Sequence, residues 1–116
     1  MIEEKDLKQD IGKLQFDLLP VDALEELIKV YMMGANKYAP HSWEKGMKMS
    51  RIYAALLRHL FAWCGGENKD SESGLSHLTH VAWNALALLT YVKRGLTEFD
   101  DRPKPMYKVT PTKGAI

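Results

Sequence analysis

Two histidines and one asparagine share a face of a predicted helix in the second half of the chain. His77, His80 and Asn84 are spaced i, i+3 and i+7, which places their side chains on one side of an α-helix. In a groove between helices, two imidazoles and a carboxamide can ligate a metal ion, support its ligands or bind the edge of a nucleobase. The alternative is that each histidine is a hydrogen-bonded residue of the core or of its rim.

Three carboxylates precede these histidines in a glycine-flanked loop. Glu67, Asp70 and Glu72 lie just before the histidine face, so we expect their side chains to converge there. Hard divalent cations such as Mg²⁺ and Mn²⁺ take oxygen ligands, commonly a few carboxylates together with water and substrate phosphates. The competing interpretation is a solvated loop, which is typical of a run of charges.

Basic and aromatic residues outside this segment could bind a nucleotide. Arg58 and His59 are adjacent on the preceding predicted helix, and a guanidinium suits bidentate phosphate contact, with a surface ion pair as the alternative. A loop nearer the N-terminus offers cations and aromatic rings that could neutralise a phosphate and stack on a base. Its candidate residues are Asn36, Lys37, Tyr38, Trp43 and Lys45. Trp43 could equally be a core side chain beneath that loop.

Helical periodicity predicts three helices that position these groups. The first runs from Pro20 to about Met33, and we expect Glu25 or Glu26 on its flank to face the groove. The second starts with Ser50 as N-cap and ends at the glycines 65 and 66. The third starts with Ser76 as N-cap, continues to about residue 94 and stops at a glycine. No stretch alternates as a half-buried strand does, so the predicted fold class is all-α, a small helical bundle.

Two apolar stripes are expected to form the core. The stripe on the second helix comprises Tyr53, Leu56, Leu57, Leu60, Phe61 and Cys64. The stripe on the third helix comprises Leu78, Ala82, Ala85, Leu89 and Val92. Residues 36–48 and 67–74 are expected to be loops, residues 1–19 an arm with one short helix, and residues 97–116 an extended tail. Three helices with apolar flanks seldom close a bundle, so we expect a homodimer or homotetramer in which subunits can share the site.

Composition limits the class of protein. The chain has 116 residues with 46% hydrophobic and 27% charged side chains, typical of one globular domain spanning residues 1–116. A net charge of +1 disfavours stable nucleic-acid binding. The single cysteine excludes an internal disulfide and favours a reducing compartment. The longest nearly apolar run, residues 81–92, is shorter than the roughly 20 residues that a bilayer requires, so we expect a cytoplasmic protein without a membrane partner.

Several motifs in one order resemble a known family. They are F-D-L-L-P at 16–20, G-A-N-K-Y at 34–38, W-E-K-G at 43–46, R-H-L-F-A-W at 58–63, the segment 66–80 and W-N-A-L-A-L-L at 83–89. Over about residues 13–95 the chain is similar to the dATP/dGTP diphosphohydrolase N-terminal domains of phages and bacteria. That family is grouped with the all-α, MazG-like nucleotide pyrophosphohydrolases. The resemblance implies Mg²⁺-dependent cleavage of a deoxynucleoside triphosphate to monophosphate and pyrophosphate, in phage nucleotide metabolism and in a bacterial or phage-infected host cytoplasm.

The metal-binding residues are assigned from the candidate groups above, because this chain departs from the metal-binding signature of MazG-like proteins. That signature is E-E-x-x-E followed closely by E-x-x-D, whereas Glu25 and Glu26 are followed by Lys29, and Glu67-x-x-Asp70 comes about forty residues later. We expect two or more Mg²⁺ or Mn²⁺ ions between the first helix and residues 67–80, and a water attacking the α-phosphorus with a carboxylate as general base. The expected ligands are Glu26, Glu67, Asp70, Glu72, His59 and His77, with Glu26 and Glu67 as catalytic residues. The expected substrate-binding residues are Asn36, Lys37, Tyr38, Trp43, Lys45, Arg58, His80 and Asn84.

Two other functions stay open at this point. In the first, a phosphohydrolase removes phosphate from a nucleotide at one transition-metal ion, bound by His59, Asp70, His77 and His80. In the second, a non-enzymatic helical module contacts nucleic acid or a partner through a basic, proline-containing tail. The basic residues of that tail are Arg102, Lys104, Lys108 and Lys113. The nearly neutral net charge counts against the second function.

Overall fold

The computed structural model describes residues 9–103, and three helices dominate them. They are α2 (Val21–Lys37), α3 (Met49–Cys64) and α4 (His77–Lys93). Three short 3₁₀ helices accompany them: η1 (Phe16–Leu18), η2 (Ser42–Lys45) and η3 (Thr97–Phe99). Within the described residues there is no strand, and one isolated bridge pairs Lys69 with Ser76. The all-α prediction is confirmed.

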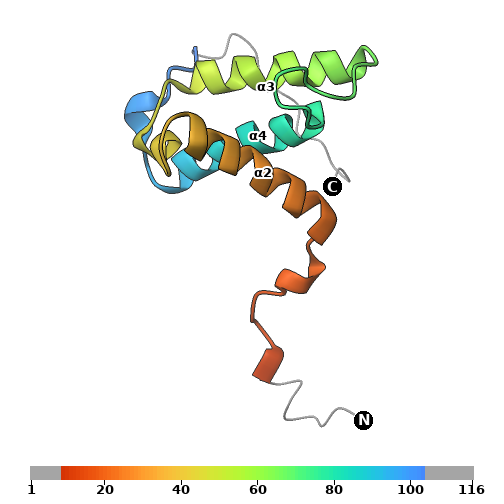
Figure 1. Ribbon diagram of the computed structural model, residues 1–116. Helices are drawn as coiled ribbons and strands as arrows, with labels where there is room; N and C mark the ends of the chain where they lie inside the picture. Colours follow the sequence, from red (N-terminus) through yellow and green to blue (C-terminus); the bar gives the residue numbers. More distant parts are fainter. Residues whose placement is uncertain (1–8, 104–116) are drawn as a thin grey trace, which may run out of the picture.

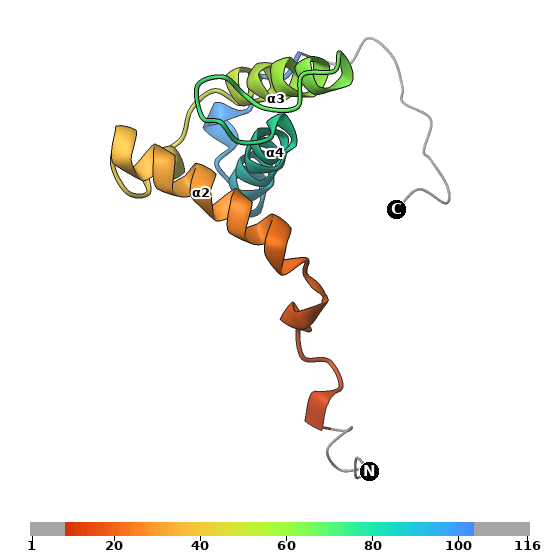
Figure 2. The same cartoon turned by 45° about the vertical axis from the view of Figure 1, so that its right-hand side comes forward.

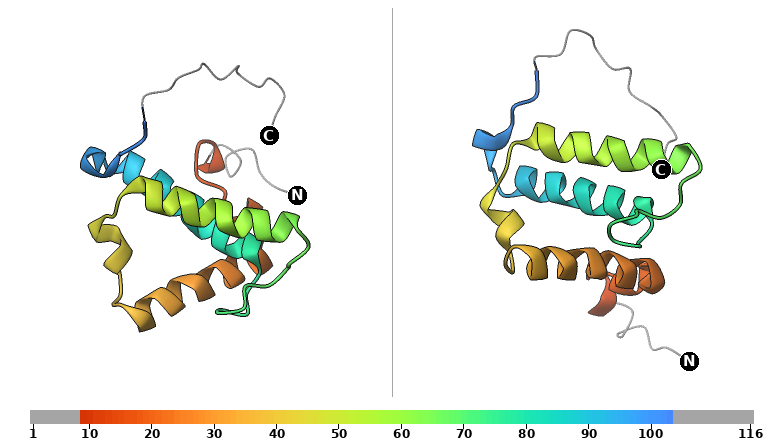
Figure 3. Two further views of the ribbon diagram at one scale, coloured as in Figure 1. Left: turned by 90° about the horizontal axis from the view of Figure 1, so that it is seen from above. Right: turned by 45° about the horizontal axis from the view of Figure 1, so that its top comes forward.

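Helix α4 is the middle element of the fold. It lies between α2 and α3 and packs against both, more extensively against α3 (Figures 1 and 3). The segment before α2 projects away from the helices (Figure 2), and its large apolar side chains, including Leu14 and Phe16, are exposed. None of the helices between residues 9 and 103 is both long and apolar enough to cross a membrane.

The start of α4 is fixed by its predicted cap and by the loop in front of it. The Ser76 hydroxyl accepts a hydrogen bond from the Leu78 amide at 3.1 Å, which satisfies one of the free donors of the first turn. The loop folds back on itself, because the Asp70 amide donates to the Leu75 carbonyl at 2.8 Å and the His77 amide to the Asn68 carbonyl at 2.9 Å. This segment therefore holds its polar side chains against the first turn of α4.

Two predicted helix boundaries are wrong. Helix α2 continues through Gly34 to Lys37, since one glycine inside a helix costs only about 1 kcal/mol, so part of the expected loop is helical. Ser50 does not cap α3, which has Lys48 at the N-cap position. Instead, the Ser50 amide and hydroxyl both donate to the Asp101 carboxylate, the amide at 2.8 Å. The tail thus contacts the start of α3 at residue 101. Three of the four basic tail residues named from the sequence lie in residues 104–116, outside the described part of the chain.

The core lies between α3 and α4, toward the C-terminal end of α4. Its buried members are Met49, Ile52, Ala87 and Tyr91. Partly buried side chains of η2, of α4 and of the segments that follow these two helices surround them: Trp43, Met47, Trp83, Leu88, Leu96 and Phe99. The Tyr91 hydroxyl donates to the Trp43 carbonyl, which fixes η2 over the end of α4. The core therefore determines where the aromatic residues of the loop are held.

The predicted apolar stripe of α4 is not its buried face, and that of α3 is only half-buried, since Leu56, Leu57 and Leu60 are partly buried. On α4, Leu78, Leu89 and Val92 are exposed, as are the two alanines of that stripe, whereas His77, Asn84, Ala87 and Tyr91 are buried. Each of these four buried residues precedes a stripe residue by one or two positions in the sequence. Helix α4 therefore packs against its neighbours with a face that contains both polar and apolar side chains. On α3, Tyr53, Phe61 and Cys64 are exposed and the buried side chains are those of Met49 and Ile52. The sequence pattern identified an apolar face that this single chain leaves open.

Candidate functional site

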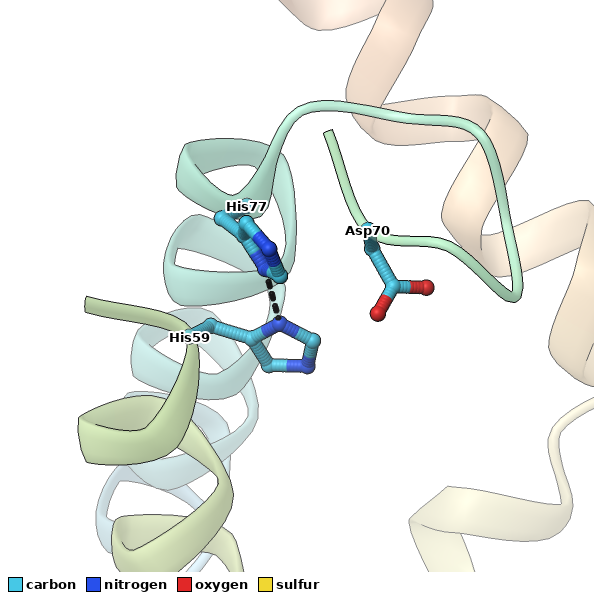
Figure 4. A group of neighbouring side chains, drawn as sticks. All are labelled: His59, Asp70 and His77. Carbon is cyan, nitrogen blue, oxygen red and sulfur yellow. Dashed lines mark hydrogen bonds between the residues drawn. The ribbon is translucent and has the colours of Figure 1, made fainter. Parts of the chain in front are cut away.

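Three histidines from two helices meet beside the loop that precedes α4. His59 of α3 and His77 at the start of α4 approach with their Nδ1 atoms 2.9 Å apart (Figure 4). The ring of His80, one turn further along α4, stacks on that of His59 with centroids 4.5 Å apart and an interplanar angle of 10°. The packing of α3 on α4 thus brings His59 to the predicted face of His77 and His80, although His59 lies eighteen residues before His77 in the chain.

Asp70 faces the same group from the loop (Figure 4). Its Oδ2 accepts a hydrogen bond from the Ser73 amide at 2.8 Å and lies 3.8 Å from His80 Nε2. His80 Nε2 is in turn 2.7 Å from the Ser73 hydroxyl. Burial alone would raise the pKa of the Asp70 carboxyl, but hydrogen bonding from Ser73 and the imidazoles of His80 and His59 lower it below its ordinary value. Asp70 is therefore an ionised carboxylate at neutral pH.

The imidazoles of this group are suited to bind as neutral ligands. Burial lowers the pKa of His59 and of His80 below the usual value, because a charged imidazolium would lose hydration there. For His80, the Asp70 carboxylate opposes this effect without reversing it. Both rings are consequently neutral at pH 7, and a neutral imidazole keeps one nitrogen lone pair for an ion or a proton.

One nitrogen of the cluster lacks a hydrogen-bond partner. His77 is only 5% exposed, and its Nε2 makes no hydrogen bond. Glu67 Oε1 lies 3.4 Å from this nitrogen but outside hydrogen-bonding geometry, and the Glu67 side chain is largely exposed. Leaving a buried polar atom unpaired costs about 1 to 3 kcal/mol, so the site is incomplete as a purely structural arrangement.

The predicted metal ligands are only partly brought together. His59, Asp70 and His77 can each offer one ligand atom, and these three atoms lie within 4.8 Å of one another. The three loop carboxylates do not converge as expected, because the loop turns at Ser73 and directs them to different neighbours. Glu67 lies beside His77, Asp70 faces His80, and Glu72 pairs with Lys37 at 3.2 Å on the surface.

Glu26, the expected contribution of the first helix, contacts the beginning of α4. Its Oε1 accepts a hydrogen bond from the Ser76 amide at 3.1 Å, which ties α2 to the N-cap residue of α4. A carboxylate is favoured at a helix N-terminus by the free amides and by the helix dipole. Glu26 therefore lies next to the cluster, while its neighbour Glu25 is exposed.

A pocket of about 960 Å³ lies between α2, the following loop and α4, and it is bordered by His59 and His80 of the histidine cluster but not by His77. One wall is aromatic: Tyr31, Trp43 and Trp83 make mutual edge or tilted contacts with centroids 5.8 to 6.0 Å apart. Six of the eight predicted substrate-binding residues line the pocket: Asn36, Lys37, Tyr38, Trp43, His80 and Asn84. The other two, Lys45 and Arg58, are exposed and do not line it.

The pocket joins polar groups to this aromatic wall. His59, Asp70, Glu72 and Ser73 line the pocket together with His80. Asn84 is buried, and its amide nitrogen donates to the His80 carbonyl at 2.7 Å. Trp43 combines both interpretations made from the sequence, since it lines the pocket and also stacks on Tyr91 of the core at 6.3 Å.

Sequence reasoning missed three residues of this site. Tyr31 and Trp83 are not among the residues predicted to bind substrate, although Trp83 is three residues from His80 on the same helix. Ser73 follows Asp70 by three residues, a spacing typical of a turn in which a carboxylate accepts a backbone amide. That turn was a usable indication that Asp70, rather than its acidic neighbours, is held in place.

Comparison with known proteins gives a consistent result. A family model described as "dATP/dGTP diphosphohydrolase, N-terminal" matches residues 3–102. The chain is 30% identical over 96 residues to a protein of Salmonella phage PMBT28 named "dATP/dGTP diphosphohydrolase". That similarity covers 83% of this chain and 32% of the relative, so the chain spans about a third of the length of the curated relative it matches. No solved structure matches the chain.

Proposed function

Because the chain belongs to the family of dATP/dGTP diphosphohydrolase N-terminal regions, we propose that it hydrolyses dATP and dGTP to the deoxynucleoside monophosphate and pyrophosphate. The observation that carries the proposal is the pocket, in which an aromatic wall and the side chains of His59, Asp70 and His80 border one space. An aromatic wall suits a purine, since stacking of a base on such a ring contributes about 1 to 3 kcal/mol. The polar end would then receive the phosphates.

The side chains around the pocket have distinct roles in this proposal. Lys37 and Tyr38 enter from the end of α2, and the lysine brings positive charge to the phosphates once it leaves its surface pair with Glu72. His80 is neutral, and in the tautomer with a free lone pair its Nε2 can accept a proton from an attacking water that takes the place of the Ser73 hydroxyl, which lies 2.7 Å from it. Glu67 remains the second candidate base, because it lies at the edge of the cluster rather than in the pocket wall.

A divalent ion is the expected cofactor, Mg²⁺ or Mn²⁺. Asp70 with His59 and His77 would hold it, and Glu67 lies next to that group. When bound, such an ion would polarise a phosphoryl oxygen and lower the pKa of a bound water. Two imidazoles and one carboxylate suit Mn²⁺ better than Mg²⁺, which prefers an all-oxygen set.

Product analysis tests the proposed function. We expect the purified chain, supplied with Mn²⁺ or Mg²⁺, to release pyrophosphate from dATP and dGTP at least about 10-fold faster than from dCTP and dTTP, since a purine stacks over a larger area. Chelation should abolish the release, and re-addition of the ion should restore it. Release of inorganic phosphate instead would favour the phosphohydrolase alternative, which the histidine–aspartate group also supports. Absence of hydrolysis with every nucleotide and ion would contradict both.

We also propose that a second copy of the chain covers the open face of α4. The exposed residues of this face recur at spacings of three and four, the pattern of a helix–helix seam: Leu78, Ala82, Ala85, Leu89 and Val92. Helix α4 carries no aspartate, glutamate, lysine or arginine before Lys93, so nothing charged interrupts the seam. Pairing two such faces would complete a bundle across the subunits.

Light scattering coupled to size exclusion tests this assembly. We expect a homodimer or homotetramer, and we expect Leu89→Lys to shift the chain toward the monomer by at least about 10-fold in dissociation constant. Leu89 is 53% exposed in the single chain, so the substitution should leave the fold intact. Ile28→Lys, at an exposed site on α2, is the control that should keep the assembly. A monomeric parent chain, or a Leu89→Lys variant that assembles like the parent, would contradict the proposal.

A further inference from the structure

The buried Nε2 atom of His77 has no hydrogen-bond partner among the described residues. Its Nδ1 is engaged with His59 Nδ1 at 2.9 Å, and one of these two atoms must donate while the other accepts. Whichever tautomer His77 adopts, its Nε2 is left with an unused proton or an unused lone pair in a side chain that solvent barely reaches. A metal ion would use such a lone pair.

The candidate ligands grouped with His77 are of mixed type. The group that can offer three ligand atoms within 4.8 Å contains two imidazoles and one carboxylate, His59, His77 and Asp70. Magnesium in proteins keeps a nearly all-oxygen octahedral shell, whereas Mn²⁺, Co²⁺ and Zn²⁺ accept imidazole together with carboxylate. The carboxylates expected to build an oxygen shell are directed elsewhere, Glu26 to the Ser76 amide and Glu72 to Lys37.

Neighbouring groups hold these donors in fixed orientations. His80 stacks on the ring of His59, and Ser73 donates its amide to the Asp70 carboxylate. Such outer contacts orient metal ligands and raise their affinity. The three donors also come from three separate elements, α3, the loop and the first turn of α4 (Figure 4). A bound ion would therefore link the loop to both helices.

We propose that His59, Asp70 and His77 form a centre for one divalent transition-metal ion, with Mn²⁺, Co²⁺ or Zn²⁺ bound in preference to Mg²⁺. The inference rests on the proposed function only for the use of the ion in hydrolysis. Binding of the ion itself is a property of these side chains and can be measured without nucleotide.

Metal content and spectroscopy of the full chain test the centre directly. The chain is stripped with a chelator, dialysed against Mg²⁺, Mn²⁺, Co²⁺ or Zn²⁺ in turn, and analysed for bound metal. We expect about one ion per chain for each of the last three, and at least about 100-fold weaker binding of Mg²⁺. With Co²⁺ we expect a visible absorption band that reports nitrogen and oxygen ligands.

Variants locate the ion. We expect His77→Gln and, independently, His59→Gln to weaken Co²⁺ binding by at least about 10-fold. His41→Gln is the matched control, because His41 is the one histidine of the chain outside the cluster and its side chain is exposed. Circular dichroism checks that each variant remains helical, and His59→Gln serves as the second variant should His77→Gln not fold. Retention of parental Co²⁺ affinity by folded His59→Gln, or a parent chain that prefers Mg²⁺, would overturn the proposal.

The two proposals fail in different ways. A chain that binds Co²⁺ through His59 and His77 yet releases no pyrophosphate from any deoxynucleotide would contradict the proposed function and support the centre. A chain that releases pyrophosphate from dATP and dGTP, and whose folded His59→Gln variant binds Co²⁺ as tightly as the parent, would support the function and overturn the centre.

Discussion

Replacing Asp70 by asparagine is expected to lower kcat/KM for dATP hydrolysis by about 100-fold or more. The amide oxygen of asparagine can still accept the Ser73 amide, so the turn of the loop should survive. What is lost is the negative charge next to His80 and His59, together with the only carboxylate in the group of three candidate metal ligands. Steady-state pyrophosphate release measured with saturating Mn²⁺ gives the rate, and metal affinity measured on the same variant separates loss of the ion from loss of the negative charge beside His80.

The control for this variant is Asp22→Asn. Asp22 is an exposed carboxylate in the first turn of α2 and does not line the pocket. We expect its kcat/KM to remain within about twofold of the parent, since the charge is exposed to solvent, where salt screens it, and lies outside the pocket lining. An Asp70→Asn variant that differs from the parent by less than about threefold would show that the histidine–aspartate cluster is not where hydrolysis occurs.

The largest expected effect on stability comes from Ile52→Ala. Ile52 is 2% exposed and is packed between α3 and α4 with Met49, Ala87 and Tyr91. Removing its side chain should lower the free energy of unfolding by about 3 kcal/mol, because transfer energy is lost and a cavity is left behind. Total stabilities of small domains are about 5 to 15 kcal/mol, so this is a large fraction. Urea denaturation followed by circular dichroism measures the change.

The same substitution at an exposed site provides the comparison. Ile28 on α2 is 54% exposed, and Ile28→Ala should change the free energy of unfolding by less than about 1 kcal/mol. Equal losses for Ile28→Ala and Ile52→Ala would mean that the core is not the α3–α4 interface described above. Because Ile52 carries no polar group and lies outside the pocket lining, its loss should change activity only through the folded fraction.

Much of the local structure could be predicted from the sequence. The N-cap at Ser76 and the end of α3 at two glycines depend on residues that lie within a few positions of each other, so they can be identified without the rest of the fold. The common face of His77, His80 and Asn84 follows from the period of a helix in the same way. Ser50 shows the limit, because its hydrogen bonds go to Asp101, fifty-one residues away.

By itself, the sequence determined three helices, their approximate ends and which side chains share a face of each, because these depend on the period and on neighbouring residues. Only the tertiary structure decided which face of α4 is buried, and it chose the one containing Asn84 and Ala87 over the stripe containing Leu89. It also decided that His59 meets His77 and that Asp70, not Glu72, joins them. A helical period fixes the angle between residues on one helix, whereas the rotation of that helix against its neighbours is set by the packing of all of them together.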